Sequence, residues 1–238
     1  MAGGYYTALS GMRARTEALD RVASDIANAS TAGYKGERST TEQANRPSFG
    51  AVLQSAVDVV SGESRTDFRP GALTPSGRAM DVAIEGQGFL AVQTAQGQRY
   101  TRNGHLVRRA DGALATDEGD AVMGVGGLIQ IGQGDVQIDA DGTVREGKSV
   151  VGNLKVVDFP PGTAFDRDGG TRFRTSATPQ AIDKPLLTSG SLEQSNVAIV
   201  QRVAELSEVS RNYQTLLKAV SVLMNDVDRG AITELGRR

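Results

Sequence analysis

Two stretches, one near each end of the chain, carry apolar residues at alternating spacings of three and four. In the first, about residues 4 to 30, the row is Leu9, Met12, Thr16, Leu19, Ala23 and Ile26. This spacing places side chains on one face of an α-helix and is typical of a coiled-coil seam. Thr16 and Ala23 weaken the seam, so we expect this helix to need partners for its stability.

The second stretch, about residues 195 to 230, is longer. Its row is Ile199, Val203, Leu206, Ser210, Tyr213, Leu217, Val220, Met224 and Val227, and Val209, Leu216 and Val222 widen the apolar stripe. We expect a helix of roughly 33 residues, about 50 Å long. Ser195 or Asn196 is the expected N-cap and Gly230 the expected end. We predict that the two helices pair with each other and pack further between subunits.

Between about residues 80 and 190 apolar and polar residues alternate, which predicts β-strands. The expected strands cover 80–84, 89–92, 98–102, 105–109, 113–116, 136–139, 143–145 and 154–159. Asn103-Gly104, Asp111-Gly112 and Asp141-Gly142 are expected hairpin turns. Many short strands with turns between them favour an all-β domain, either a small sandwich or a barrel-like sheet.

The sequence thus predicts an α+β protein, with paired, coiled-coil-like terminal helices flanking a central all-β domain. We divide it into 1–35 (N-terminal helix and the turn after it), 36–79 (extended connector), 80–190 (β domain) and 191–238 (C-terminal helix). Within the connector, residues 51–60 fit a helix or a strand equally well. Such a long stretch with little regular structure is unusual, so we expect it to become ordered against something else.

Composition excludes several classes of protein. The net charge is −2, from 26 basic and 28 acidic residues, whereas nucleic-acid-binding proteins usually carry a basic surface. The chain has no cysteine, so disulfides and thiolate metal sites are excluded. It has no apolar run long enough to insert into a membrane and no pattern of a cleaved signal peptide. If the protein leaves the cytoplasm, we expect another route of export.

Motifs that would indicate chemistry fail on their context. The glycine pattern at residues 86–91 resembles a dinucleotide fingerprint, but a strand rather than a helix is expected after it. The Asp-Gly stretches at 139–142 and 166–169 lack an acidic residue at the twelfth position of a calcium loop. The one histidine, His105, is interpreted as a solvated strand residue. We therefore expect no catalytic residue, no cofactor and no metal site.

The stretch from Asp25 to Lys35 ends the first helix. Asn28, Ser30 and Thr31 favour a helix exit because their side chains compete with helical hydrogen bonds. Gly33 can adopt the left-handed conformation that often follows a last helical turn.

Three separated motifs resemble those of one family. They are SDIANASTAGYK at 24–35, MDVAIEGQGFLAV at 80–92 with RYTRNG at 99–104, and GSLEQSNV at 190–197. Together they resemble the axial proteins of the bacterial flagellum, the basal-body rod and hook family. The chain departs from that family's pattern at Asp25, where Asn is common, and at Ala32, where Pro or Asn is common.

The resemblance implies a non-enzymatic structural subunit of the basal-body rod, most similar to the proximal-rod proteins, with a distal-rod protein as the alternative. It implies contacts with other copies and other rod proteins, export by the flagellar type III apparatus without a cleaved signal, and a place in the periplasm. A secreted cell-wall enzyme with paired acids and a β-rich adhesin are alternatives from other classes.

Two sets of residues are the expected functional ones. The expected subunit-interface residues are Leu9, Met12, Leu19, Ile26, Ile199, Val203, Leu206, Tyr213, Leu217, Val220 and Met224. The expected rod motif consists of Asn28, Ser30, Thr31, Gly33 and Tyr34.

Overall fold

The computed structural model describes residues 2–39 and 64–235. Most of the expected connector lies outside the described residues. This includes residues 51–60, for which the sequence left helix or strand open. The chain forms two compact units. Unit 1 draws on residues 1–27, 37–65 and 197–238, and unit 2 on residues 28–36 and 66–196. The boundaries of the four segments expected from the sequence stay predictions.

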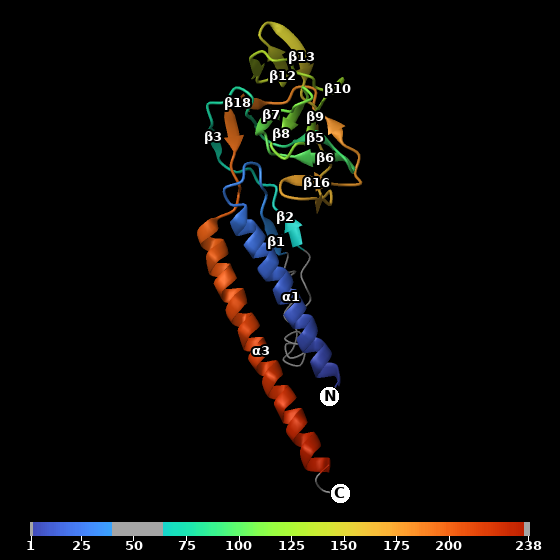
Figure 1. Ribbon diagram of the computed structural model, residues 1–238, viewed down its shortest axis with the longest axis vertical. Helices are drawn as coiled ribbons and strands as arrows, with labels where there is room; N and C mark the ends of the chain where they lie inside the picture. The colour runs from blue at the N-terminus through green and yellow to red at the C-terminus, as the bar shows by residue number, and fades with distance from the viewer. Residues whose placement is uncertain (1, 40–63, 236–238) are drawn as a thin grey trace. The chain divides into compact units, whose positions relative to one another are not determined.

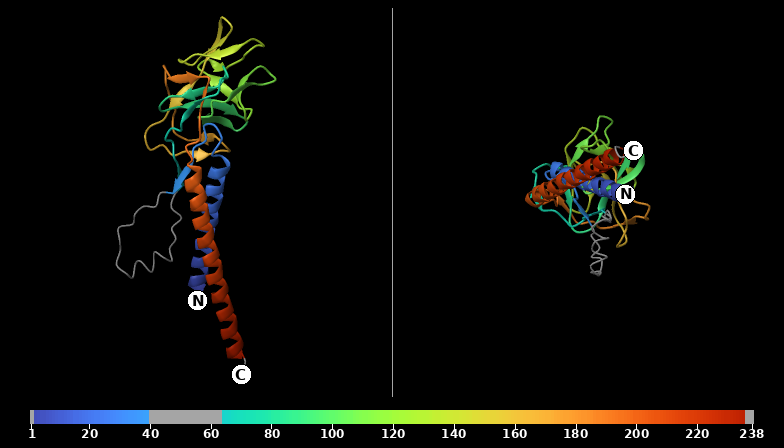
Figure 2. Two further views of the ribbon diagram at one scale, coloured as in Figure 1. Left: turned by 90° about the vertical axis from the view of Figure 1, so that its left-hand side faces the viewer. Right: turned by 90° about the horizontal axis from the view of Figure 1, so that it is seen from below.

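Unit 1 is built on two long helices, α1 (Ala2–Ala27) and α3 (Ile199–Leu235). They lie side by side and antiparallel, as Figures 1 and 2 show from several directions. A short ribbon joins β1 (Glu37–Ser39) to β2 (Ser64–Thr66). Both terminal helices are therefore confirmed, and with them the α+β class.

The expected ends of α3 are wrong at both sides. The helix starts at Ile199, and the amide of Arg202 donates to the carbonyl of Ala198, so neither Ser195 nor Asn196 is its N-cap. Gly230 does not end the helix, which continues to Leu235. A single glycine costs a helix only about 1 kcal/mol, and good helix formers on both sides offset that cost.

Unit 2 is a β structure of several sheets. Its strands are β3 (Leu73–Pro75), β4 (Val82–Ile84), β5 (Phe89–Thr94), β6 (Gly97–Thr101), β7 (Leu106–Arg108), β8 (Leu114–Thr116), β9 (Ala121–Gly124), β10 (Gly127–Leu128), β11 (Val136–Ile138), β12 (Thr143–Glu146), β13 (Ser149–Asn153), β14 (Val156–Asp158), β15 (Asp166–Arg167), β16 (Arg172–Arg174), β17 (Gln180–Ala181), β18 (Leu187–Ser189) and β19 (Ser191–Glu193).

The largest sheet is organised around the β5–β6 hairpin, whose register runs from Leu90 opposite Thr101 to Thr94 opposite Gly97. Its main strand order is β15-β16-β6-β5-β9-β8-β7, and β14 also pairs with β5. A second sheet has the order β11-β12-β13, and β18–β4 and β19–β3 form two-stranded ribbons. Alternation of apolar and polar residues predicted this β character because successive side chains of a strand point to opposite faces.

Two clusters form the core of unit 2. One is aliphatic and includes Leu90, Leu106, Leu114 and Ile138. The other is aromatic, and its rings meet mainly edge to face with centroids 4.8–6.4 Å apart. Its members are Phe68, Phe89, Tyr100, Phe159, Phe165 and Phe173. Edge-to-face ring pairs add roughly 0.5–1.5 kcal/mol each beyond the area that they bury.

Two of the three expected turns are confirmed. Gly112 (φ 83°) lies between the paired strands β7 and β8, and Gly142 (φ 85°) between β11 and β12. The hairpin expected at Asn103-Gly104 is wrong, because β6 pairs with β5 and β16 while β7 pairs with β8. Gly104 lies so close to Val82 that a Cβ would overlap the Val82 carbonyl oxygen. A close approach of two backbones, not a tight turn, requires this glycine.

The interpretation of His105 as a solvated residue is also wrong. Its side chain is 27% exposed, and its Nδ1 lies 3.1 Å from a carboxylate oxygen of the buried Asp81. Arg78 Nη1 lies 3.0 Å from the other ring nitrogen. The histidine therefore belongs to a packed polar cluster, which the sequence pattern could not reveal.

Among the described residues, no helix is both long enough and apolar enough to span a membrane. In the same part of the chain, no three His, Cys, Asp or Glu side chains are grouped as metal ligands.

Candidate functional site

The three sequence motifs meet in unit 2 at one buried group of charges, which we call the charge cluster: Lys35, Arg102 and Glu193. Lys35 Nζ lies 2.5 Å from Glu193 Oε1, and Arg102 Nε lies 2.7 Å from Glu193 Oε2. All three side chains are almost fully buried. Lys35 lies in residues 28–36, here called the strap; Arg102 follows β6; and Glu193 ends β19. Residues far apart in sequence thus share one carboxylate.

Backbone groups complete the charge cluster. The amide of Gly71 donates to Glu193 Oε1, and Lys35 Nζ donates to the carbonyl of Arg69. Arg102 Nη2 donates to the carbonyls of Ile84 and Gly86. These bonds matter because an ion pair in a protein interior offsets its desolvation cost only when the remaining donors and acceptors are satisfied.

Two cations and one anion leave the charge cluster unbalanced. Burial lowers the pKa of Lys35 below its ordinary value of 10.5, against the hydrogen bond and attraction of Glu193 and with the help of the nearby Arg102. Burial opposes ionisation of Glu193, but Arg102 and Lys35 outweigh it and hold the pKa of that carboxyl below 4.5. The cluster therefore favours the charged form of Glu193 and disfavours the charged form of Lys35.

The strap fits into unit 2 through its last residues. Gly33 has φ 69°, and a Cβ there would overlap the backbone of Arg102 and Asn103. Tyr34 is 1% exposed, and the Arg167 guanidinium stacks 4.5 Å from its ring centroid. Arg167 also donates to the carbonyl of Lys35. The left-handed conformation expected at Gly33 is confirmed, and contact with Asn103 adds a second reason for a glycine.

The other residues of the expected rod motif form the turn that leads into the strap. The amide of Thr31 donates to the carbonyl of Asn28 (3.0 Å), and the Thr31 hydroxyl donates to the Asn28 side chain (3.2 Å). Ser30 is exposed. Gly33 donates its amide to the carbonyl of Glu193 (2.7 Å). The helix exit expected here is confirmed, since α1 ends at Ala27.

Asn196 fastens three segments of unit 2 together. Its side-chain amide donates to the carbonyls of Asp67 (2.6 Å) and Arg69 (3.0 Å). Its side-chain oxygen accepts from the amide of Gly36 (2.8 Å). The sequence pattern predicted a helix cap here, whereas the side chain holds the end of the strap.

The residues expected at a subunit interface are only partly covered in unit 1. Met12, Leu19 and Ile26 of α1 and Leu206, Tyr213 and Val220 of α3 are half-buried, and Leu9 and Met224 lie within the two helices. Ile199, Val203 and Leu217 of α3 are 48%, 47% and 41% exposed. Full burial of such a side chain stabilises a protein by roughly 1.5–3 kcal/mol. Because these three side chains are still partly exposed, further burial would add to the stability. Their role at a subunit interface stays a prediction.

An ion pair occupies the contact between the helices. Asp25 Oδ2 lies 3.0 Å from Arg202 Nη2, and the aspartate side chain is 1% exposed. Next to it on α1, Val22 is fully buried. Asp25 also accepts from the amide of Glu37, and Arg202 donates to the carbonyl of Glu37. The pair therefore links α1, β1 and α3 within unit 1.

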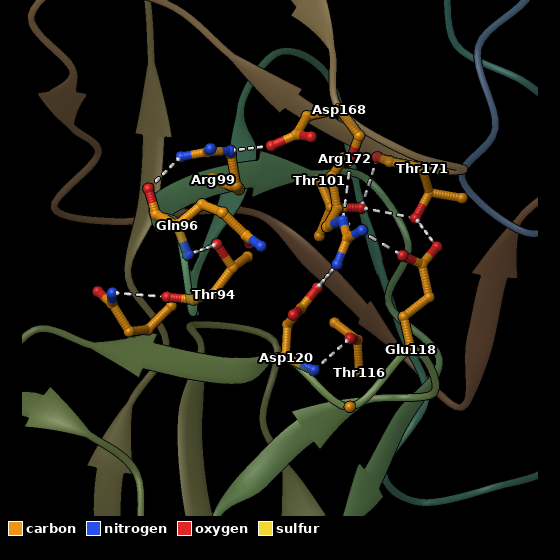
Figure 3. Close-up of polar contacts among 12 residues, drawn as sticks. Thr94, Gln96, Arg99, Thr101, Thr116, Glu118, Asp120, Asp168, Thr171 and Arg172 are labelled. Carbon is orange, nitrogen blue, oxygen red and sulfur yellow. Dashed lines mark hydrogen bonds and ion pairs between the residues drawn. The ribbon is translucent and has the colours of Figure 1, made fainter.

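Acidic side chains at the β8–β9 turn are engaged in structural contacts. Figure 3 shows Arg172 directed at both Glu118 and Asp120, with Nη1 2.8 Å from Asp120. Thr171 donates to Glu118 (3.0 Å), and hydrogen bonding to Asp120 raises the pKa of Arg172. A general acid–base pair needs carboxylates directed at a substrate, whereas these two hold β16 to the turn.

Sequence reasoning missed the residues that carry most of this geometry: Val22, Asp25, Lys35, Arg102, Arg167, Glu193 and Arg202. The available signal was that charged residues recur inside otherwise apolar or glycine-rich motifs. Buried charges are rare unless they are paired, so a charge in such a place indicates a partner. The sequence could not say which partner.

Two family models match separate parts of the chain. Residues 6–35 match "Flagella basal body rod protein", and residues 83–146 match "Flagellar hook protein FlgE/F/G D1 domain". Over 246 aligned residues the chain is 34% identical to the flagellar basal-body rod protein FlgF of Caulobacter vibrioides, covering 100% of this chain and 99% of that protein. The chain belongs to the flagellar basal-body rod protein family.

Other rod proteins are similar over nearly the whole length. FlgF of Escherichia coli is 31% identical, covering 94% of this chain and 95% of that protein. FlgG of Bacillus subtilis is 29% identical, covering 93% and 95%. The rod-protein match runs from residue 6 to residue 35, so it contains most of α1 and nearly all of the strap. Of the charge cluster, Lys35 lies in the rod-protein match and Arg102 in the hook-protein D1 match, whereas Glu193 lies outside both.

Proposed function

We propose that this chain is a FlgF-type structural subunit of the flagellar basal-body rod and that it assembles with other copies and with neighbouring rod and hook proteins. Similarity to FlgF proteins over the full length supports this reading. FlgG, similar at 29%, gives the alternative of a distal-rod subunit. Location in the basal body, across the periplasm, and export by the flagellar type III apparatus without a cleaved signal follow from the same assignment.

The observation that carries the proposal is the apolar surface left open on α3. Ile199, Val203 and Leu217 recur along one edge of a helix and remain substantially exposed beside α1. Side chains of this kind along a 37-residue helix favour burial against a further helix. Head-to-tail contacts of this type, when they do not close into a ring, generate a helical array of subunits. We propose a structural role and no catalysis for this subunit.

The test places a charge on that edge. Leu217→Asp should leave unit 2 folded, because Leu217 belongs to unit 1, yet it should block incorporation into the rod. Burying the new carboxylate without a partner costs several kcal/mol. The matched control is Thr215→Asp, which adds the same charge at an exposed polar position on another side of the same helix.

The assay measures whether each variant restores motility to a strain that lacks its own FlgF. A parallel strain that lacks FlgG decides between the two rod positions. Secretion of each variant is measured separately, so that failed export is not read as failed assembly. Normal motility with Leu217→Asp would refute the proposal.

A further inference from the structure

Each helix of unit 1 carries two heptad rows that are one residue apart. The first rows contain the ion pair and face the helix contact: Gly11, Ala18 and Asp25 on α1, and Arg202, Val209 and Leu216 on α3. The second rows follow directly in sequence: Met12, Leu19 and Ile26 on α1, and Val203, Ser210 and Leu217 on α3. On both helices the residues of the second row belong to the seam that the apolar spacing predicted.

At the ion pair, burial does not follow hydrophobicity. Asp25 is buried, whereas the neighbouring Ile26 is only half-buried, and Arg202 is less exposed than Val203. Elsewhere Ala18 of the first row is half-buried like Met12 and Leu19 of the second. Two isolated amphipathic helices would bury their most apolar faces against each other. Some other interaction must set their rotation.

We propose that Asp25 and Arg202 are positioning residues that fix the rotation of α1 against α3, so that the apolar second rows stay at the flank of the pair and receive a second copy of the chain. This inference rests on the function proposed above. Successive residues of a helix point about 100° apart. Turning either helix by one residue would bring the second row into the contact and carry Asp25 or Arg202 out of it.

The ion pair resists this rotation because of its surroundings. Asp25 is buried, so its carboxylate depends on the Arg202 guanidinium and on the amide of Glu37. Arg202 also contacts the carbonyl of Glu37 and the carboxylate of Glu205. A buried ion pair often stabilises a fold no more than apolar residues of the same volume, and its best-attested use is to select one arrangement. Here the ion pair selects an arrangement that leaves apolar side chains of the second rows partly exposed to solvent.

Exposed charges beside the second rows indicate a second copy as the occupant. Arg211 and Lys218 are exposed on α3, and neither forms an ion pair within the described residues. On α1, Asp20 is exposed, whereas the exposed Glu17 is already paired with Arg13. The second row of α3 in one copy can therefore meet the second row of α1 in the next, with opposite charges on the flanks.

The test replaces the ion pair with apolar residues in the full chain, as Asp25→Leu with Arg202→Met. The matched control, Arg13→Met with Glu17→Leu, removes an exposed ion pair of the same helix. Spin labels at Asp20→Cys and Ser207→Cys report the rotation of the helices, since the chain has no native cysteine. Urea unfolding by far-UV circular dichroism reports helix stability, and motility of complemented cells reports assembly.

We expect the apolar pair to keep or raise helix stability, to change the label-to-label distance, and to reduce assembly at least tenfold, while the control leaves all three unchanged. An unchanged distance, or unchanged assembly, would overturn the inference. Loss of stability together with assembly would also overturn it, because that is the result of a merely structural pair. If the wild-type chain did not assemble, the proposed function would fail, and the label distance would still decide the positioning role.

Discussion

Replacing Glu193 with glutamine removes the one anion of the charge cluster and leaves its shape. In the native chain, Glu193 accepts from Lys35 Nζ, Arg102 Nε and the amide of Gly71. After the substitution, two buried cations face each other across a neutral amide. Lys35 and Arg102 are both buried, so water cannot hydrate them in place of the lost carboxylate.

The structure sets the size of the effect. Removing one partner from a buried, hydrogen-bonded ion pair costs about 3–5 kcal/mol. That is a large share of the roughly 5–15 kcal/mol that stabilises a typical domain. Lys35→Met should destabilise unit 2 less. Arg102 still pairs with Glu193 in this variant, and burying the charged lysine already costs free energy in the native chain. The expected order of destabilisation is therefore Glu193→Gln above Lys35→Met.

The pH dependence has a definite sign. The pKa of Glu193 is lower in the folded chain than its ordinary value of 4.5. Its contribution to stability is therefore complete above pH 4.5 and is lost as the pH falls below that value through the lowered pKa. Wild-type unit 2 should lose stability over that acidic window, and Glu193→Gln should lose less over the same window.

The assay is urea unfolding followed by near-UV circular dichroism. The chain has no tryptophan, and Tyr34 and Tyr100 are buried tyrosines of unit 2, so their signal reports that unit. Asp166→Asn is the control, since the ion pair of Asp166 with Arg174 is mostly exposed and should contribute nothing measurable. A loss below about 1 kcal/mol for Glu193→Gln, or a larger loss for Lys35→Met, would refute the reasoning.

Two further substitutions test the strap. Gly33→Ala should destabilise unit 2 by more than about 2 kcal/mol, because it adds backbone overlap with Asn103 to the roughly 1–2 kcal/mol of left-handed strain. The control is Gly77→Ala, at φ 73° with nothing within 4 Å of a Cβ, which should show the strain alone. Equal losses of stability in urea unfolding would contradict the close approach at Gly33. Asn196→Ala should cost about 1–3 kcal/mol by leaving partly buried backbone groups without their side-chain partner, and hydrogen exchange at Gly36 should accelerate; an unchanged exchange rate would contradict that role.

Local patterns predicted both helices and part of the β structure. Apolar spacing located the helices, and alternation located eight strands of unit 2, because each reflects which face of an element is buried. Alternation missed β3, β9, β10, β13 and β15 to β19. The Asp-Gly turns were predictable because glycine adopts positive φ at low cost. The Asn103-Gly104 hairpin failed for the opposite reason. Its residues have a turn-like composition, but β6 and β7 each have other partners, and strand pairing depends on the whole sheet.

The sequence by itself determined that the chain has amphipathic helices at its ends, a β structure between them and a glycine exit after the first helix. These features depend on residues within a few positions of one another. Only the tertiary structure decided which charges pair. Lys35, Arg102 and Glu193 are separated by 158 residues at the widest, and Asp25 and Arg202 meet across two helices. Burial makes a charge depend on a partner, but only the folded chain determines which partner it has.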